Sequence, residues 1–248
     1  MEVHHHPHVE KKSFKEYLLE GLMIFLAVSM GFIAENIRER VTENKKEGEY
    51  IESIVEDLST DQHNIDSSVI NLNRRFRYTD SLVYLLNMKE KMVNTADFYY
   101  YARIAPRYVP FVSHSATFDE MKSSGMFRII RDKNIVKKIL EYYAYQPVIK
   151  DYETRVSVID GEYRLIFAQM ADPVVTAGMF DYKKQGIEKP LGNPPLRNRS
   201  PELMATLSMK AQNMLTIRSA VYWQIIDMQK AGKELLALIE KEYHLKKE

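Results

Sequence analysis

The chain has 248 residues and carries 35 Lys and Arg against 34 Asp and Glu, with no cysteine. The near-zero net charge excludes the broad positive field that binds nucleic acid, and the missing cysteines exclude disulfides, thiol nucleophiles and cysteine-ligated metal sites. Only nine Gly and nine Pro are present, and several of them gather in residues 173–201. The long uninterrupted segments elsewhere predict an all-α fold.

Residues 1–16 form a polar N-terminal tail that contains His4, His5, His6 and His8. Imidazole is a common metal ligand. The irregular spacing of these histidines, close to the end of the chain, favours an unstructured tail over a metal site.

The segment 17–34 is the only apolar run that fits neither a half-buried helix nor a strand. As a helix its eighteen residues reach about 27 Å, against about 30 Å for the hydrocarbon core of a bilayer. We therefore predict a single transmembrane helix over residues 17–36. The alternatives are a buried core helix of a soluble protein and a signal peptide. Glu10 and Glu16 and the lack of a small-x-small cleavage pattern disfavour a signal peptide, so we expect the segment to be retained.

One face of this predicted helix indicates association with another helix. Ala27, Gly31 and Ala34 fall close together on it, and small residues four apart let membrane helices approach closely. Glu20 lies one turn inside the N-terminal end of the segment. This carboxylate either reaches the headgroups beside Lys12 and Lys15, or it is buried in an oligomer or in a proton or ion path.

Basic residues flank the predicted membrane helix on both sides, so the positive-inside rule barely discriminates the two orientations. The short tail favours a cytoplasmic N-terminus and a periplasmic C-terminal domain at a bacterial inner membrane. Membrane lipid is the first expected partner, followed by a second copy of the chain or the subunits of a membrane complex. The flanking cations are Lys11, Lys12, Lys15, Arg38, Arg40, Lys45 and Lys46.

A heptad-like stripe follows, within a predicted stalk helix over residues 37–92. Eleven of fifteen positions at alternating steps of four and three residues are apolar. This stripe predicts a long helix that packs in a coiled-coil-like seam, either within the chain or with a neighbour. The positions are Ile37, Val41, Asn44, Gly48, Ile51, Val55, Leu58, Gln62, Ile65, Val69, Leu72, Phe76, Thr79, Val83 and Leu86.

Residues 93–248 are predicted to complete an antiparallel helical bundle. Asn94 precedes a short helix that Pro106 and Pro110 end. A helix over 148–171 leads to the irregular loop 172–200. Ser200 and Pro201 then start a second long helix that reaches about residue 243.

The most distinctive local sequence lies in residues 117–143. It predicts a helix that contains Ser123 and Ser124 and ends at Gly125, since glycine adopts positive φ readily, and a second helix capped by Asp132. We treat these four residues as a structural motif. The helix-turn-helix outline also fits DNA binding, which the neutral charge balance and the membrane segment disfavour.

This motif, with Thr117-Phe118, Ile129-Ile130 and Tyr142-Tyr143 and with the span ending Gly31-Phe-Ile-Ala-Glu-Asn-Ile37, resembles a family of bacterial single-pass membrane proteins. The resemblance covers residues 17–45 and 115–145. It departs from the family where the exit from the span lacks an Asn-rich, Trp-containing sequence. It implies a membrane anchor and an all-helical body, and it brings no assigned activity and no catalytic residues.

Sequence patterns for chemistry are few. The chain has no phosphate-binding glycine loop, no Gly-x-Ser-x-Gly and no His-Glu-x-x-His. Asp61 with His63, and Glu240 with His244, are spaced as metal ligands but lack a third partner. We therefore expect no catalysis, cofactor or metal. The sequence predicts a membrane-anchored scaffold or accessory subunit that self-associates or joins an envelope complex, with a membrane-tethered sensory or ligand-binding module as the alternative.

Overall fold

The computed structural model describes residues 13–88 and 94–244, so the predicted histidine cluster at residues 4–8 lies outside the described residues. The described chain is predominantly helical, and its longest element is α1, Phe14–Leu86, with 73 residues. Two compact units, Met1–Ile51 and Glu52–Glu248, meet within this helix. The all-α prediction is confirmed.

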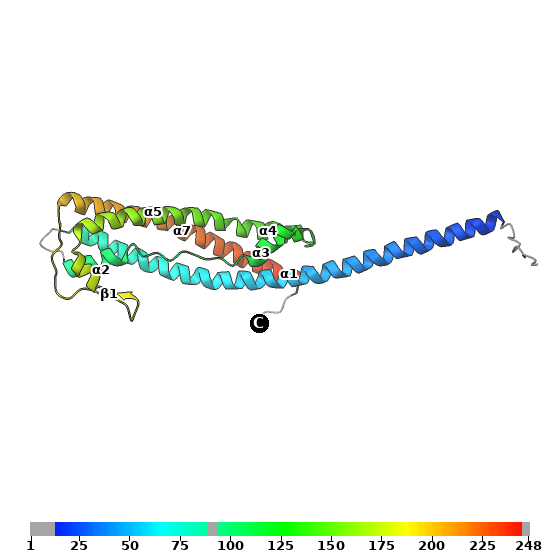
Figure 1. Ribbon diagram of the computed structural model, residues 1–248, viewed down its shortest axis with the longest axis horizontal. Coiled ribbons are helices and arrows are strands. Elements are labelled where there is room, and N and C mark those ends of the chain that lie inside the picture. Colours follow the sequence, from blue (N-terminus) through cyan, green and yellow to red (C-terminus); the bar gives the residue numbers. More distant parts are fainter. Residues whose placement is uncertain (1–12, 89–93, 245–248) are drawn as a thin grey trace, which may run out of the picture. The chain divides into compact units, whose positions relative to one another are not determined.

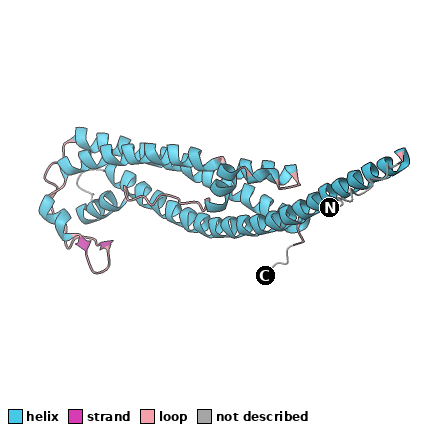
Figure 2. Ribbon diagram, turned by 45° about the vertical axis from the view of Figure 1, so that its right-hand side comes forward, coloured by secondary structure: helices cyan, strands magenta, loops and turns pink. Residues whose placement is uncertain are grey.

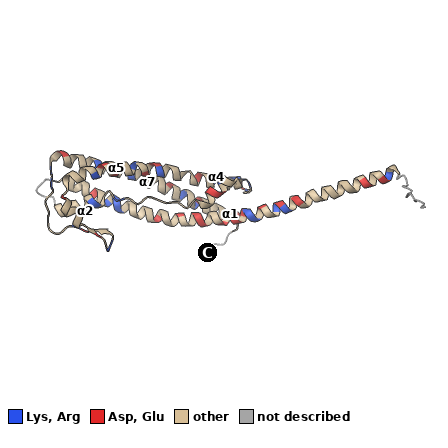
Figure 3. Ribbon diagram, in the orientation of Figure 1, with Lys and Arg blue, Asp and Glu red and all other residues tan. Residues whose placement is uncertain are grey.

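The first unit contains the N-terminal part of α1. Within the described residues this is the one helix long and apolar enough to cross a membrane, and none of its apolar window is buried. Leu18, Phe25 and Phe32 are 63%, 66% and 69% exposed. Between Glu20 and Glu35 the ribbon of α1 carries no charged residue (Figure 3). A core helix of a soluble domain would bury these side chains, whereas within the first unit they are exposed.

The second unit is a bundle with three helical columns (Figures 1 and 2). One column is the C-terminal part of α1, residues 52–86. The second is α4, Lys133–Tyr143, followed directly by α5, Tyr145–Met170. The third is α7, Pro201–Glu242, which runs antiparallel to both other columns. Ser200 caps α7 by accepting a hydrogen bond from the Leu203 N–H at 3.3 Å, so the predicted start of this helix is confirmed.

One of the two rows in the predicted apolar stripe on α1 is buried as predicted. In the other row, the buried positions lie one residue earlier than predicted. Leu58, Ile65, Leu72, Thr79 and Leu86 are buried as predicted. The second predicted row, Val55, Gln62, Val69, Phe76 and Val83, is only half-buried, and the buried row one residue earlier contains Ile54, Asp61 and Leu82. The sequence pattern failed here because it assigned the polar Asp61 to the surface. Within the described residues α1 ends at Leu86, short of the predicted residue 92.

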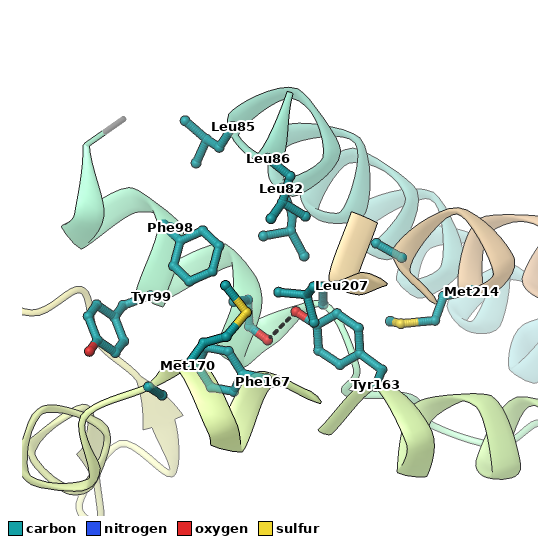
Figure 4. Close-up of a cluster of buried hydrophobic side chains, with 14 of the residues drawn as sticks. Leu82, Leu85, Leu86, Phe98, Tyr99, Tyr163, Phe167, Met170, Leu207 and Met214 are labelled. Atoms are coloured by element: carbon teal, nitrogen blue, oxygen red, sulfur yellow. Dashed lines mark hydrogen bonds between the residues drawn. The ribbon is translucent and has the colours of Figure 1, made fainter. Parts of the chain in front are cut away.

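A short helix closes one end of the bundle. It is α2, Thr95–Ile104, and Asn94 caps it by accepting from the N–H groups of Ala96 and Asp97. Figure 4 shows its aromatic side chains packed in a core with α1, α5 and α7. The Tyr163 hydroxyl on α5 donates to the Ala102 carbonyl at 3.0 Å, which ties the two helices together inside this core.

The predicted motif helices are present as α3, Ala116–Ser124, and α4. A 3-10 turn, Met126–Arg128, joins them. Gly125 has φ +70°, the left-handed conformation expected at the end of α3. Asp132 caps α4 by accepting from Asn134 N–H at 2.7 Å and from Ile135 N–H. The sequence reading of this region is confirmed.

The segment 172–200 is more ordered than the predicted irregular loop. It contains α6, Pro173–Gly178, and a hairpin of β1, Phe180–Asp181, with β2, Gly186–Ile187. Asp172 caps α6 by accepting from Val174 N–H at 2.8 Å, with Pro173 at the first helical position. Asp172-Pro173 starts α6 in the same way as Ser200-Pro201 starts α7, whereas residues 188–200 form no helix or strand.

Candidate functional site

The predicted association face of the membrane helix is open in the first unit. Ala27, Gly31 and Ala34 are exposed and Glu20 is half-buried. A Cβ added to Gly31 would meet nothing within 4 Å. Lipid or another protein chain therefore has free access to this face within the first unit.

The Ser-Ser-Gly motif has a structural role. The hydroxyls of Ser123 and Ser124 both donate to the Glu120 carbonyl, at 3.0 and 2.7 Å. These bonds tie both side chains to the backbone of α3, whose C-cap is Gly125. Both serine side chains are exposed.

Neither predicted metal pair assembles a metal site. Asp61 is buried, whereas His63 is exposed and its Nδ1 lies 2.9 Å from the Ser59 carbonyl oxygen. Residues 13–88 and 94–244 contain no group of three His, Asp or Glu side chains that could hold a metal ion. The pair Glu240 and His244 therefore gains no third ligand within that part of the chain.

Sequence analysis missed an extended segment, residues 105–115, which we call the strap. It leaves α2 and runs along the bundle to α3 without forming a helix or strand (Figure 1). An extended chain leaves its backbone groups without regular partners, so side chains must satisfy them. Arginines and carboxylates from the three columns do this at several points.

At the start of the strap, three arginines bind three successive carbonyl oxygens. Arg75 on α1 donates to Ile104 at 3.3 Å, Arg218 on α7 to Ala105 at 2.7 Å, and Arg164 on α5 to Pro106 at 2.9 Å. The last carbonyls of a helix have no intrahelical partners and lie at the negative end of its dipole. Arg75 meets both requirements at Ile104, whereas Arg218 and Arg164 bind the next two carbonyls, which belong to the strap.

Arg218 is also the cation of a buried ion pair. Its Nη2 donates to both carboxylate oxygens of Asp160, at 2.7 and 2.8 Å. Burial raises the pKa of Asp160, and the charge and hydrogen bonds of Arg218 oppose that rise. The Tyr108 ring lies 6.0 Å from the guanidinium carbon of Arg218. A pair this deeply buried fixes α5 against α7.

Two more carboxylates hold the middle and the end of the strap. Glu153 accepts from the Tyr108 hydroxyl and the Phe111 N–H, both at 2.7 Å. Asp61 accepts from the hydroxyls of Ser113 and Tyr142 and from the His114 N–H. Burial raises the pKa of Asp61, while these hydrogen bonds act in the opposite direction. These hydrogen bonds hold the strap against the bundle.

A cavity of about 540 Å³ lies beside the start of the strap, within the second unit. It is bounded by α2, α5, α6, the hairpin and the segment before α7. Its lining contains four arginines and no Asp or Glu. The lining residues are Ala102, Arg103, Pro106, Arg107, Arg164, Phe167, Ala168, Ala171, Pro173, Thr176, Phe180, Ile187 and Arg197.

The cavity combines an apolar floor with a cationic rim. Ala102, Pro106, Phe167 and Ala171 are buried and form the floor, whereas three of the four arginines are exposed and Arg107 is half-buried. Arg103 and Arg107 lie four residues apart, whereas Arg164 and Arg197 come from distant parts of the sequence. Only the fold brings these three regions together, so the sequence offered no signal for this site.

These observations define an all-helical protein with one candidate membrane helix, a three-column bundle and an arginine-rimmed cavity. No family model matches the chain, and neither a curated protein nor a solved structure matches it. The proposals below therefore rest on the geometry and on the sequence patterns alone.

Proposed function

We propose that this chain is a single-pass protein of the bacterial inner membrane whose helical domain self-associates or joins an envelope complex. The observation that carries the proposal is the apolar stretch of α1, none of which is buried among the residues that the structure describes. An exposed apolar surface of this length is stable when lipid surrounds it.

Self-association is supported by one face of α1. Glu20, Ala27, Gly31 and Ala34 fall within a narrow arc at about 100° per residue. Beyond the apolar stretch, Ile37 is 57% exposed and Val41 is 63% exposed. Both belong to the heptad stripe, so an apolar seam continues past the predicted span without a partner in the described part of the chain. Helix pairing in lipid and in water would bury this seam.

The test is native mass spectrometry of the full chain in mild detergent. We expect an oligomer or a copurified membrane protein. Gly31→Leu should weaken either assembly because it separates the closely packed backbones. Ser29→Leu adds a similar side chain on roughly the opposite face and should leave assembly unchanged. A monomer with no copurified protein would remove the proposal.

The proposed orientation has its own test. The chain has no cysteine, so a single Ser157→Cys variant on the exposed surface of α5 supplies a unique label site. A membrane-impermeant maleimide added to intact spheroplasts should label this variant if the helical domain is periplasmic. Labelling only after lysis would reverse the proposed orientation.

A ligand-binding module is the second candidate function. The observation that favours it is the arginine-rimmed cavity, because a concave apolar site with a few convergent polar groups is the usual form of a small-molecule site. This role is compatible with membrane anchoring. Equilibrium dialysis of the full chain against a set of charged and neutral aromatic compounds tests it directly.

A further inference from the structure

We infer that the cavity lined by Arg103, Arg107, Arg164 and Arg197 binds an organic anion, with its apolar body on the floor and its carboxylate, phosphate or sulfonate group at the rim. This inference rests on the second candidate function and specifies its ligand class. It is independent of self-association.

The lining of the cavity is positively charged. The lining has four cations and no anion, although the whole chain has a net charge of only +1. Arg107 lies close enough to Arg75 to lower the pKa of that guanidinium, after the larger effect of burial. Arg107 and Arg75 therefore repel each other. A bound anion would relieve that repulsion.

Two of these arginines are held in place by hydrogen bonds to the backbone. Arg164 donates to the Pro106 carbonyl at 2.9 Å. Arg197 donates to the carbonyls of Ala168 and Gln169, both at 3.4 Å. These bonds hold two guanidinium groups in place. A guanidinium has five N–H donors, so most of them stay available. Planar guanidinium groups match carboxylate, phosphate and sulfonate oxygens in pairs.

Arg103 and Arg107 differ from the other two. No hydrogen bond or ion pair of either side chain occurs among the described residues, although carboxylates such as Asp97 and Glu153 lie on neighbouring elements and are engaged elsewhere. Removing these two guanidinium groups should therefore change the field of the cavity without breaking a structural contact.

The size and polarity of the cavity fit a small organic molecule. A volume of about 540 Å³ falls within the range of about 300–1,000 Å³ that is usual for small-molecule sites. The buried floor offers Phe167 and alanine surfaces, which favour a ring or a short acyl chain over a bare inorganic ion. The ligand therefore needs both parts, an apolar body and an anionic group.

The experiment is isothermal titration calorimetry of the full chain in nanodiscs of zwitterionic lipid, with empty nanodiscs as the blank. The three probes are naphthalene-1-sulfonate, the neutral 1-naphthol and inorganic phosphate. We expect the sulfonate to bind at least about tenfold more tightly than either of the other probes, because only it uses floor and rim together.

Three variants assign the binding to the cavity. Arg103→Gln with Arg107→Gln should weaken sulfonate binding about tenfold or more. Arg77→Gln with Arg128→Gln removes the same charge from exposed positions outside the lining and should leave the affinity unchanged. Ala168→Phe, at an exposed lining position, should block binding with all four arginines present. Thermal unfolding of each variant checks that the bundle is intact.

A membrane lipid could supply the same chemistry as a soluble metabolite. Competition by dihexanoyl phosphatidate, a soluble short-chain lipid, separates the two sources: displacement of the sulfonate supports a lipid anion, and its absence supports a soluble one. Equal sulfonate binding by the wild-type chain and the Arg103/Arg107 variant would overturn the inference. If 1-naphthol bound as tightly as the sulfonate, ligand binding would stand and the anionic class would fail. If no probe bound, both would fail, and self-association would be unaffected.

Discussion

Arg218 on α7 and Asp160 on α5 form an ion pair inside the bundle, in which Arg218 Nη2 donates to both carboxylate oxygens of Asp160. The two side chains are 1% and 7% exposed. Arg218→Met should lower the free energy of unfolding by about 3–5 kcal/mol, because it leaves the Asp160 charge buried without a partner. Urea unfolding of the full chain in detergent, followed by helical circular dichroism, measures this loss.

The matched control for this prediction removes both charges. Arg218→Met with Asp160→Leu should recover a large part of the lost stability, since no charge remains buried. Recovery should be incomplete, because the Ala105 carbonyl at the start of the strap loses its donor. A double variant less stable than Arg218→Met alone would contradict this account of the pair.

The buried carboxylate of Asp61 makes the fold sensitive to pH. Its pKa in the folded chain is raised above the ordinary value of 3.8, chiefly by burial. The folded chain therefore keeps this proton over a pH range in which the unfolded chain has lost it. The contribution of Asp61 to stability is largest below that range, falls as pH rises through the folded pKa and is constant above it.

Asp61→Asn removes this titration while leaving an oxygen that accepts hydrogen bonds. The difference in unfolding free energy, wild type minus variant, should therefore decrease as pH rises from about 3.8 and then level off. Urea unfolding of both proteins at a series of pH values gives this difference, and Asp160 titrates in both. A difference that grows with pH would show that the hydrogen bonds outweigh burial.

Gly232 on α7 marks a close approach between helices. A Cβ at this position would clash with Gln62 Nε2 and would lie 2.9 Å from Tyr142 Cε2. The Gln62 amide can move, but the Tyr142 ring is buried and its hydroxyl donates to Asp61. Gly232→Ala should therefore destabilise the fold by about 1–3 kcal/mol.

Gly161 on α5 supplies the control, because a Cβ there would meet nothing within 4 Å and the residue is exposed. Gly161→Ala should stabilise the fold by about 0.5–1 kcal/mol through helix propensity. Thermal unfolding compares the two variants. Equal shifts in Tm would refute the close approach at Gly232.

Local signals in the sequence predicted most of the helices. Asn94, Asp132 and Ser200 each cap a helix as expected, and Gly125 ends one with positive φ. Such signals are readable because the side chain and the backbone it satisfies lie within a few residues of each other. Asp172 caps α6 by the same local chemistry, although the sequence analysis does not predict that helix.

The strap and the cavity could not be predicted from the sequence in the same way. Asp61 reaches Ser113 and Tyr142 across large sequence separations, and Arg218 reaches Ala105 across a still larger one. Residues of this kind look like ordinary surface charges until the columns are packed. The sequence indicated the composition of the bundle, whereas three-dimensional contacts decide which charges are buried.

The central claim is that the exposed apolar part of α1 crosses a membrane. Ile24 and Val28 lie near its middle, and both are exposed. Each Lys introduced there should cost about 2.5–3.5 kcal/mol in a membrane helix. The variant Ile24→Lys with Val28→Lys should therefore lose membrane association. Val158→Lys, at an exposed position on α5, should retain it.

The most direct measurement is the fractionation of bacterial cells that express the full chain, with an alkaline carbonate wash of the membranes. The account predicts that the wild-type chain stays in the washed membranes and is released only by detergent. Wild-type chain in the soluble fraction, or in the carbonate supernatant, would contradict it.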